Sequence, residues 1–78
     1  MALIIDIHQV GRRGDLVEYE YGCIGRKGRF VVDAGSRAVQ LVKMAPGERD
    51  EQWFQPAKRR IELALRDGKL PEHAVWAS

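Results

Sequence analysis

Few residues in this sequence combine reactive side chains with a spacing that would support chemistry. His8, Glu18 and Glu20 are the strongest set, because their alternation with apolar residues places all three on one face of a predicted sheet. An imidazole beside two carboxylates can bind a metal ion or transfer a proton. However, one histidine beside carboxylates on an open sheet usually belongs to an ordinary solvated surface and not to a functional site. We therefore expect no catalytic residue, no metal site and no cofactor.

The remaining reactive side chains stand alone in the sequence. Cys23 is the one cysteine, which excludes an internal disulfide framework and a cysteine zinc site. It falls on the inward side of a predicted strand and no base accompanies it, so we interpret it as a small core residue. His73 follows Pro71 and Glu72 without a partner at any motif spacing. These observations predict that the protein is not an enzyme.

Basic residues suggest a second kind of chemistry, the binding of phosphate. The 13 Lys+Arg and 11 Asp+Glu residues give a net charge of only +2, which is a weak field. The basic residues that would contact a nucleic acid lie at predicted hairpin tips and on the outer side of a predicted helix: Arg12, Arg13, Arg26, Lys27, Lys58, Arg59, Arg66 and Lys69. Because the first two tips lie at opposite ends of an antiparallel sheet, these residues do not make one patch.

The elements that position these side chains belong to one small α+β domain, residues 1–78. A chain of 78 residues with 45% hydrophobic and 31% charged residues is typical of one globular domain. No apolar run approaches the roughly 18 residues of a membrane span. The first residues do not resemble a signal peptide, so we expect a cytoplasmic protein that does not bind a membrane.

Alternating apolar residues predict a four-stranded antiparallel meander over about residues 2–44. The inward side chains of the four strands are Leu3, Ile5, Ile7, Val17, Tyr19, Tyr21, Phe30, Val32, Val39 and Leu41. Three loops keep them on one face, because a loop of the wrong parity would turn a strand over. The predicted loops are Arg12–Gly14, Arg26–Lys27 and Gly35–Ser36.

One helix is predicted over about residues 51–67, with Asp50 as its N-cap and Gly68 at its end. Its apolar stripe, which covers the inward face of the sheet, is Trp53, Ala57, Ile61, Ala64 and Leu65. Pro56 leaves two alternatives, a bend at that residue or a helix that begins there. The tail, residues 68–78, is expected to dock through Trp76, either on the open face of the sheet or beside the helix.

The open face of the sheet is the predicted interaction surface. In the predicted register, His8 lies opposite Glu18 and Asp6 opposite Glu20. An apolar row crosses the middle of this face, and Gly22 would leave a gap where a partner approaches closely. The residues predicted to take part are Ile4, Gly22, Val31, Gln40 and Trp76. We therefore predict a non-enzymatic protein-interaction module that binds another protein or itself as a homodimer; the alternative is a weak nucleic-acid-binding module.

Three short stretches also resemble parts of small bacterial proteins of unknown function. They are Tyr19–Gly22, Gly28–Phe30 and the ending from Gly68 through Ser78. Those proteins combine short hairpins, one helix and a C-terminal tail with a tryptophan. The resemblance implies a bacterial, cytoplasmic origin, and it implies no activity and no site residues.

Overall fold

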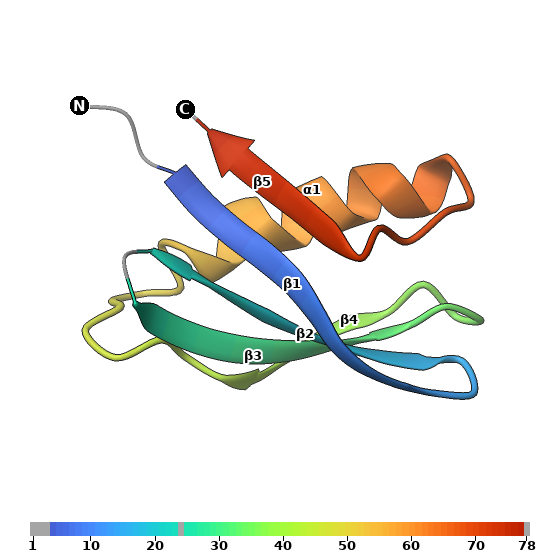
Figure 1. Cartoon of the computed structure of the whole chain (residues 1–78), viewed down its shortest axis with the longest axis horizontal. Helices are drawn as coiled ribbons and strands as arrows, with labels where there is room; N and C mark the ends of the chain where they lie inside the picture. Colours follow the sequence, from blue (N-terminus) through green and yellow to red (C-terminus); the bar gives the residue numbers. More distant parts are fainter. Residues whose placement is uncertain (1–3, 24, 78) are drawn as a thin grey trace.

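A computed structural model describes residues 4–23 and 25–77 of the chain. Five strands of this part form one antiparallel sheet in the order β4-β3-β2-β1-β5, with the helix α1 on one face (Figure 1). The elements are β1 (Ile4–Arg13), β2 (Leu16–Cys23), β3 (Arg26–Asp33), β4 (Val39–Lys43), α1 (Phe54–Arg66) and β5 (His73–Ala77). The predicted α+β class is confirmed. Strands β1 to β4 follow one another as antiparallel neighbours, as predicted, but the predicted count of four strands is wrong, because the predicted tail contributes a fifth strand that pairs with β1.

The inward side chains of the sheet meet the apolar stripe of α1 and form the core. The described members of the predicted inward set belong to this core or pack against it, and Leu3 lies outside the described residues. The interpretation of Cys23 as a core residue is wrong, because Cys23 is only half-buried and is not part of this core. Tyr19 stacks on Phe30 with ring centroids 5.4 Å apart. Phe54, which the predicted stripe omitted, contacts both Tyr21 and Phe30. An aromatic cluster therefore joins the helix to the middle of the sheet.

The first hairpin satisfies the parity requirement in an unexpected way. Its loop is the two residues between Arg13 and Leu16, not the three predicted. Two loop residues alone would turn β1 over relative to β2. A β-bulge between Gln9 and Gly11 supplies the missing residue, Val10, and restores the inward side of β1. The odd residue that the pattern demands thus lies inside the strand.

In the other two hairpins the loops lie at other positions than predicted, but the same side chains point inward. β2 turns into β3 between Cys23 and Arg26, so Tyr19 lies opposite Phe30 and the predicted Arg26–Lys27 loop is part of β3. Between β3 and β4 the predicted register is correct, with Val31 opposite Gln40. The loop there is longer than Gly35–Ser36, because β3 ends at Asp33 and β4 begins at Val39. Strand faces were therefore predictable where loop boundaries were not.

The helix begins later than predicted, and its N-terminus is bound by a residue outside it. Asp50 is not the cap; it lies in the turn before α1 with a φ of 51°. The Glu48 carboxylate instead accepts hydrogen bonds from the backbone N–H groups of Trp53 (3.0 Å) and Phe54 (2.8 Å). Pro56 is the third helical residue, where a missing N–H group breaks no bond. Hence the helix starts two residues before Pro56.

Tyr21 completes the polar group around Glu48. The Tyr21 hydroxyl donates to the Glu48 carboxylate at 2.7 Å, and the Ala45 N–H donates to the same oxygen at 3.2 Å. Glu48 is only 7% exposed. Burial, together with the hydrogen bond to Glu48, raises the pKa of the Tyr21 phenol above its usual value. This buried carboxylate therefore joins the sheet, the connecting loop and the helix.

Candidate functional site

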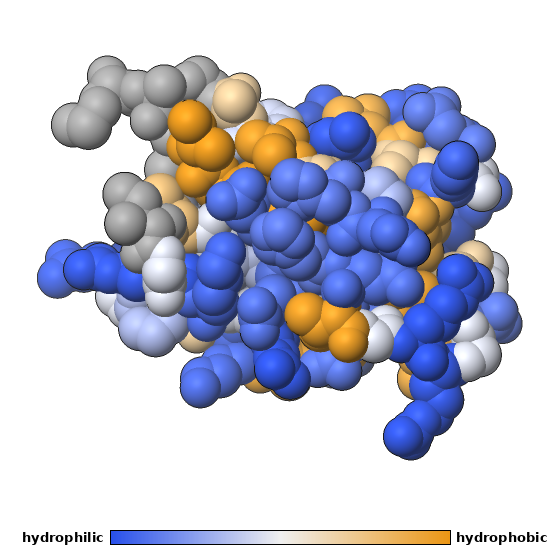
Figure 2. Space-filling view, in the orientation of Figure 1, coloured by the Kyte–Doolittle hydropathy of each residue, from blue (hydrophilic) through white to orange (hydrophobic). Residues whose placement is uncertain are grey.

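The face of the sheet that points away from α1 carries the polar side chains of the strands. In Figure 1 the helix lies behind the sheet, so Figure 2 shows this open face from the front. The surface there is mostly hydrophilic, and hydrophobic side chains appear in separate groups. The functional candidates of this face are a histidine–aspartate cluster, an arginine network and two groups of exposed apolar residues.

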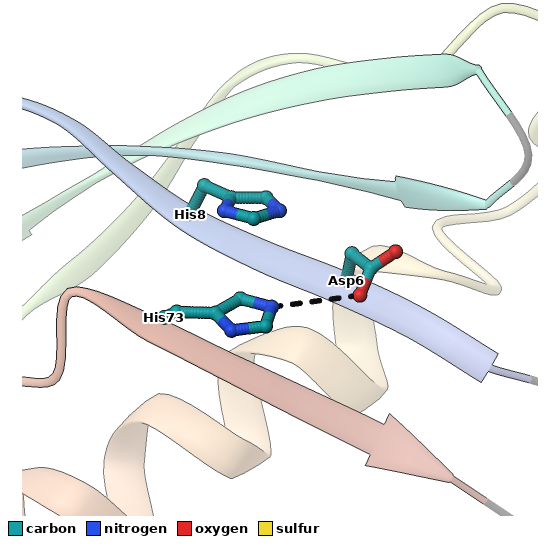
Figure 3. A group of neighbouring side chains, drawn as sticks. All are labelled: Asp6, His8 and His73. Carbon is teal, nitrogen blue, oxygen red and sulfur yellow. Dashed lines mark ion pairs between the residues drawn. The ribbon is translucent and has the colours of Figure 1, made fainter.

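The histidine–aspartate cluster, defined as Asp6, His8 and His73, lies where β1 pairs with β5 (Figure 3). His8 and His73 are direct cross-strand partners, and their imidazole rings stack with centroids 4.4 Å apart. The His73 Nε2 atom lies 3.6 Å from the Asp6 Oδ1 atom. One donor atom from each of the three residues lies within 4.8 Å of the other two. This arrangement brings together donor types that suit a transition-metal ion.

Sequence reasoning missed this cluster because it left His73 without a partner. The fifth strand brings His73 beside His8, although 64 positions separate the two in the printed sequence. One feature of the sequence could have predicted the fifth strand. Its side chains alternate, with Ala74 and Trp76 on the inner side and His73 and Val75 on the outer side. A prediction of a strand from that short alternation would have revealed the pair.

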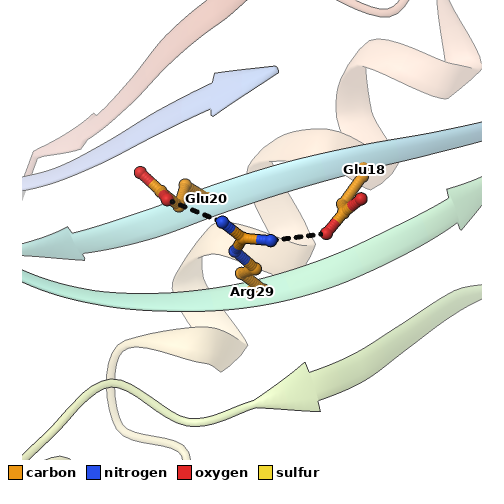
Figure 4. A network of polar contacts seen from close by, with 3 residues as sticks. All are labelled: Glu18, Glu20 and Arg29. Atoms are coloured by element: carbon orange, nitrogen blue, oxygen red, sulfur yellow. Dashed lines mark hydrogen bonds and ion pairs between the residues drawn. The ribbon is translucent and has the colours of Figure 1, made fainter. Parts of the chain in front are cut away.

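Glu18 and Glu20, predicted beside His8, are held by Arg29 instead (Figure 4). The Arg29 guanidinium lies 3.1 Å from a Glu18 oxygen and 3.5 Å from a Glu20 oxygen. The predicted pairings of His8 with Glu18 and Asp6 with Glu20 are wrong, because the turn lies at Gly14–Asp15, later than the predicted loop, and the bulge offsets only part of that shift. His8 lies opposite Glu20, and Asp6 lies opposite Gly22. One arginine thus bridges both carboxylates predicted to accompany His8.

The predicted interaction residues do not form one row. Gly22 offers no gap, since a β-carbon there would lie 1.8 Å from the carbonyl oxygen of Arg26. Trp76 is half-buried and packs against the core on the helix side, near Pro56 and Lys58. The two alternatives for the tail are thereby resolved in favour of docking beside the helix.

Two separate apolar groups remain on the open face. Ile4 is 53% exposed and lies at the β5 side, where it pairs with Ala77. Val31 lies at the other side, directly opposite Gln40 of the edge strand β4. Between these two groups lies the arginine network, which is Arg29 with Glu18 and Glu20 on β3 and β2. Of the predicted residues, only Val31 and Gln40 are neighbours.

The predicted basic residues are likewise divided between the two ends of the molecule. Arg12 and Lys69 line one shallow groove together with Arg37, which sequence reasoning did not include. Arg26 and Lys27 begin β3 at the opposite end of the sheet. Lys58 and Arg59 line a different groove beside Trp76. The structure therefore gathers only part of the predicted basic set.

Comparisons with protein-family models, with curated proteins and with solved structures found no match to this chain. Among residues 4–23 and 25–77, no helix has both the length and the apolar character that crossing a bilayer requires.

Proposed function

We propose that the chain is a non-enzymatic protein-interaction module that associates with a second copy of itself along strand β4. The observation that carries this proposal is the open edge of the sheet at β4, beside which the apolar side chains of Val42 and Met44 are 60% and 42% exposed. An edge strand presents unpaired backbone donors and acceptors, and exposed apolar residues beside it favour pairing with another strand.

One hydrogen bond shows which backbone N–H and C=O groups of β4 point toward β3 and which point toward the free edge. The Asp33 N–H donates to the Ala38 carbonyl at 2.9 Å, so Ala38 and Gln40 direct their backbone groups toward β3. Val39 and Leu41 consequently direct theirs toward the free edge. Phe30 pairs with Leu41 and Arg29 pairs with Lys43, so Val42 between them is the extra residue of a β-bulge in β4. The regular free edge is therefore short, and Val42 projects beside it.

A second copy suits this edge because two identical antiparallel strands can pair about a twofold axis. Pairing centred on Leu41 would place Lys43 of one copy opposite Val39 of the other. The two lysines then avoid facing each other, which removes the like-charge repulsion that would oppose pairing. Val31 and Val42 would lie beside the junction and lose exposed apolar surface.

The test is light scattering on a size-exclusion column for the wild type, Val42→Asp and Val75→Asp. Val75 is a matched control, since it is a 40% exposed valine on the opposite edge strand. We expect a dimer for the wild type and for Val75→Asp, and a monomer for Val42→Asp. A wild-type monomer at high micromolar concentration, or equal effects of both substitutions, would contradict the proposal.

A nucleic-acid-binding function is the second candidate, and the shallow groove lined by Arg12, Arg37 and Lys69 favours it. Three cations at one end of the molecule can contact successive phosphates. Binding of this kind weakens steeply as salt increases, because counterions are released. Titration of a labelled oligonucleotide at two salt concentrations, with Arg12→Ala and the control Arg26→Ala, would test it. Binding that ignores salt, or equal losses in both variants, would exclude this site.

A further inference from the structure

We propose that Asp6, His8 and His73 form a binding site for one divalent transition-metal ion, for which Zn²⁺ is the probe. The site goes beyond the proposed self-association, because it lies on β1 and β5 at the side of the sheet away from β4. A bound ion would join the C-terminal edge strand to the rest of the sheet.

The spacing of the donor atoms suits such an ion. Ligand atoms about 2.0–2.1 Å from a tetrahedral zinc ion lie about 3.3 Å from one another. The Asp6 Oδ1 and His73 Nε2 atoms are already 3.6 Å apart. All three donors lie within 4.8 Å of each other. The two imidazole rings stack at 13°, so they must tilt toward each other for their nitrogen lone pairs to meet at one ion.

The backbone holds the three residues in this arrangement. His8 and His73 are paired residues on neighbouring strands, and Asp6 precedes His8 by two residues on the same face. The pairing extends beyond the strand, because the Gln9 N–H donates to the Glu72 carbonyl at 2.8 Å. A site built on paired strands is positioned more firmly than one built on loops.

The donor set selects the class of ion. Two imidazoles and one carboxylate suit zinc, copper, nickel and cobalt, whereas magnesium and calcium prefer oxygen ligands. Glu20, which lies opposite His8, is engaged by Arg29 at 3.5 Å. The two histidines of the site are also the only two in the sequence. Three protein ligands leave a further coordination position for water or an added ligand.

Isothermal titration of the untagged protein with Zn²⁺ at about pH 7.5, where free histidine is mostly neutral, tests the site. We expect one ion per chain. His8→Ala and His73→Ala should each weaken binding at least about 10–100-fold, the range measured for loss of outer-shell partners. Zinc should also slow hydrogen exchange of the β5 amides in the wild type but not in the two histidine variants, since the ion links β5 to β1.

Two control variants distinguish this site from other metal binding. Cys23→Ser removes the one thiol, and Glu62→Gln removes an exposed carboxylate of α1 as a match for Asp6→Asn. Both controls should bind zinc as the wild type does, whereas Asp6→Asn should bind it more weakly. The site is overturned if the histidine variants retain wild-type affinity, if Cys23→Ser loses binding, or if one ion binds two chains. Circular dichroism of each variant confirms that it is folded.

Discussion

The two sides of the sheet use carboxylates in opposite ways. On the inner side, Glu48 is 7% exposed and accepts four hydrogen bonds, three from backbone N–H groups and one from Tyr21. On the open side, the side chains of Asp6, Glu18 and Glu20 are 45%, 41% and 30% exposed. The inner carboxylate is shut off from water by its partners, whereas the outer carboxylates form ion pairs that water still reaches.

This difference separates stability from binding. A buried charge must be fully paired, because an unpaired one costs several kcal/mol (about 3–5). In the described part of the chain, every buried polar side-chain atom has a hydrogen-bond partner. Exposed charges stay available to ligands, because water already satisfies them. We therefore expect large stability effects from the inner side and binding effects from the open side.

The largest stability effect should follow from Glu48→Ala. The substitution leaves the Tyr21 hydroxyl and the N–H groups of Ala45, Trp53 and Phe54 without their shared acceptor. Each buried unsatisfied donor costs about 1–3 kcal/mol, so we expect a loss of about 3 kcal/mol or more. Urea denaturation measures this free energy. Glu62→Ala on the exposed side of α1 is the control, with an expected change within about 0.5 kcal/mol; equal losses would break the comparison.

A smaller effect that depends on pH should follow from Tyr19→Phe. The Tyr19 hydroxyl donates to the Pro71 carbonyl at 2.6 Å and so holds the connection between α1 and β5. Its loss should cost about 1 kcal/mol at neutral pH, which urea denaturation would show.

The pH dependence has a definite sign. Burial raises the pKa of Tyr19 from 10.0 to about 12, so the unfolded chain ionises first as pH rises. The stability that Tyr19 contributes is complete below pH 10 and is lost as pH increases toward about 12. Tyr19→Phe should therefore lose less stability than the wild type over this interval. Parallel curves for the two proteins would contradict the assignment.

The smallest effect should come from Arg29→Ala on the open face. Arg29 bridges Glu18 and Glu20, but its side chain is 50% exposed. Exposed ion pairs contribute about 0–1 kcal/mol and are screened by salt. We expect a loss of less than about 1 kcal/mol by urea denaturation, and a smaller loss at high salt. A loss as large as that of Glu48→Ala would remove the distinction between the two sides.

Local patterns were sufficient to predict the faces of β1 to β4 and the apolar stripe of the helix except for Phe54. Alternation fixed which residues of β1 to β4 point inward, and the parity argument correctly required an odd residue between β1 and β2. It could not place that residue, because a longer loop and a bulge at Val10 restore the same face. The register of His8 against Glu20 depended on the position of the turn, which lies at Gly14–Asp15 and not at the predicted Arg12–Gly14.

The candidate site was beyond local patterns for a different reason. His73 joins His8 only through pairing between the two ends of the chain, and β5 is five residues long. Glu48 likewise lies five and six residues before the N–H groups it binds, outside the usual capping positions. Contacts that depend on tertiary structure leave little trace in the spacing of the sequence.

The central functional claim is self-association along the free edge of β4, and thermal unfolding at a series of protein concentrations tests it most directly. A homodimer is stabilised by mass action, so its midpoint rises with concentration. We predict such a rise for the wild type and a constant midpoint for Val42→Asp, equal to the wild-type value at the lowest concentration. A wild-type midpoint that is independent of concentration would contradict the proposed self-association.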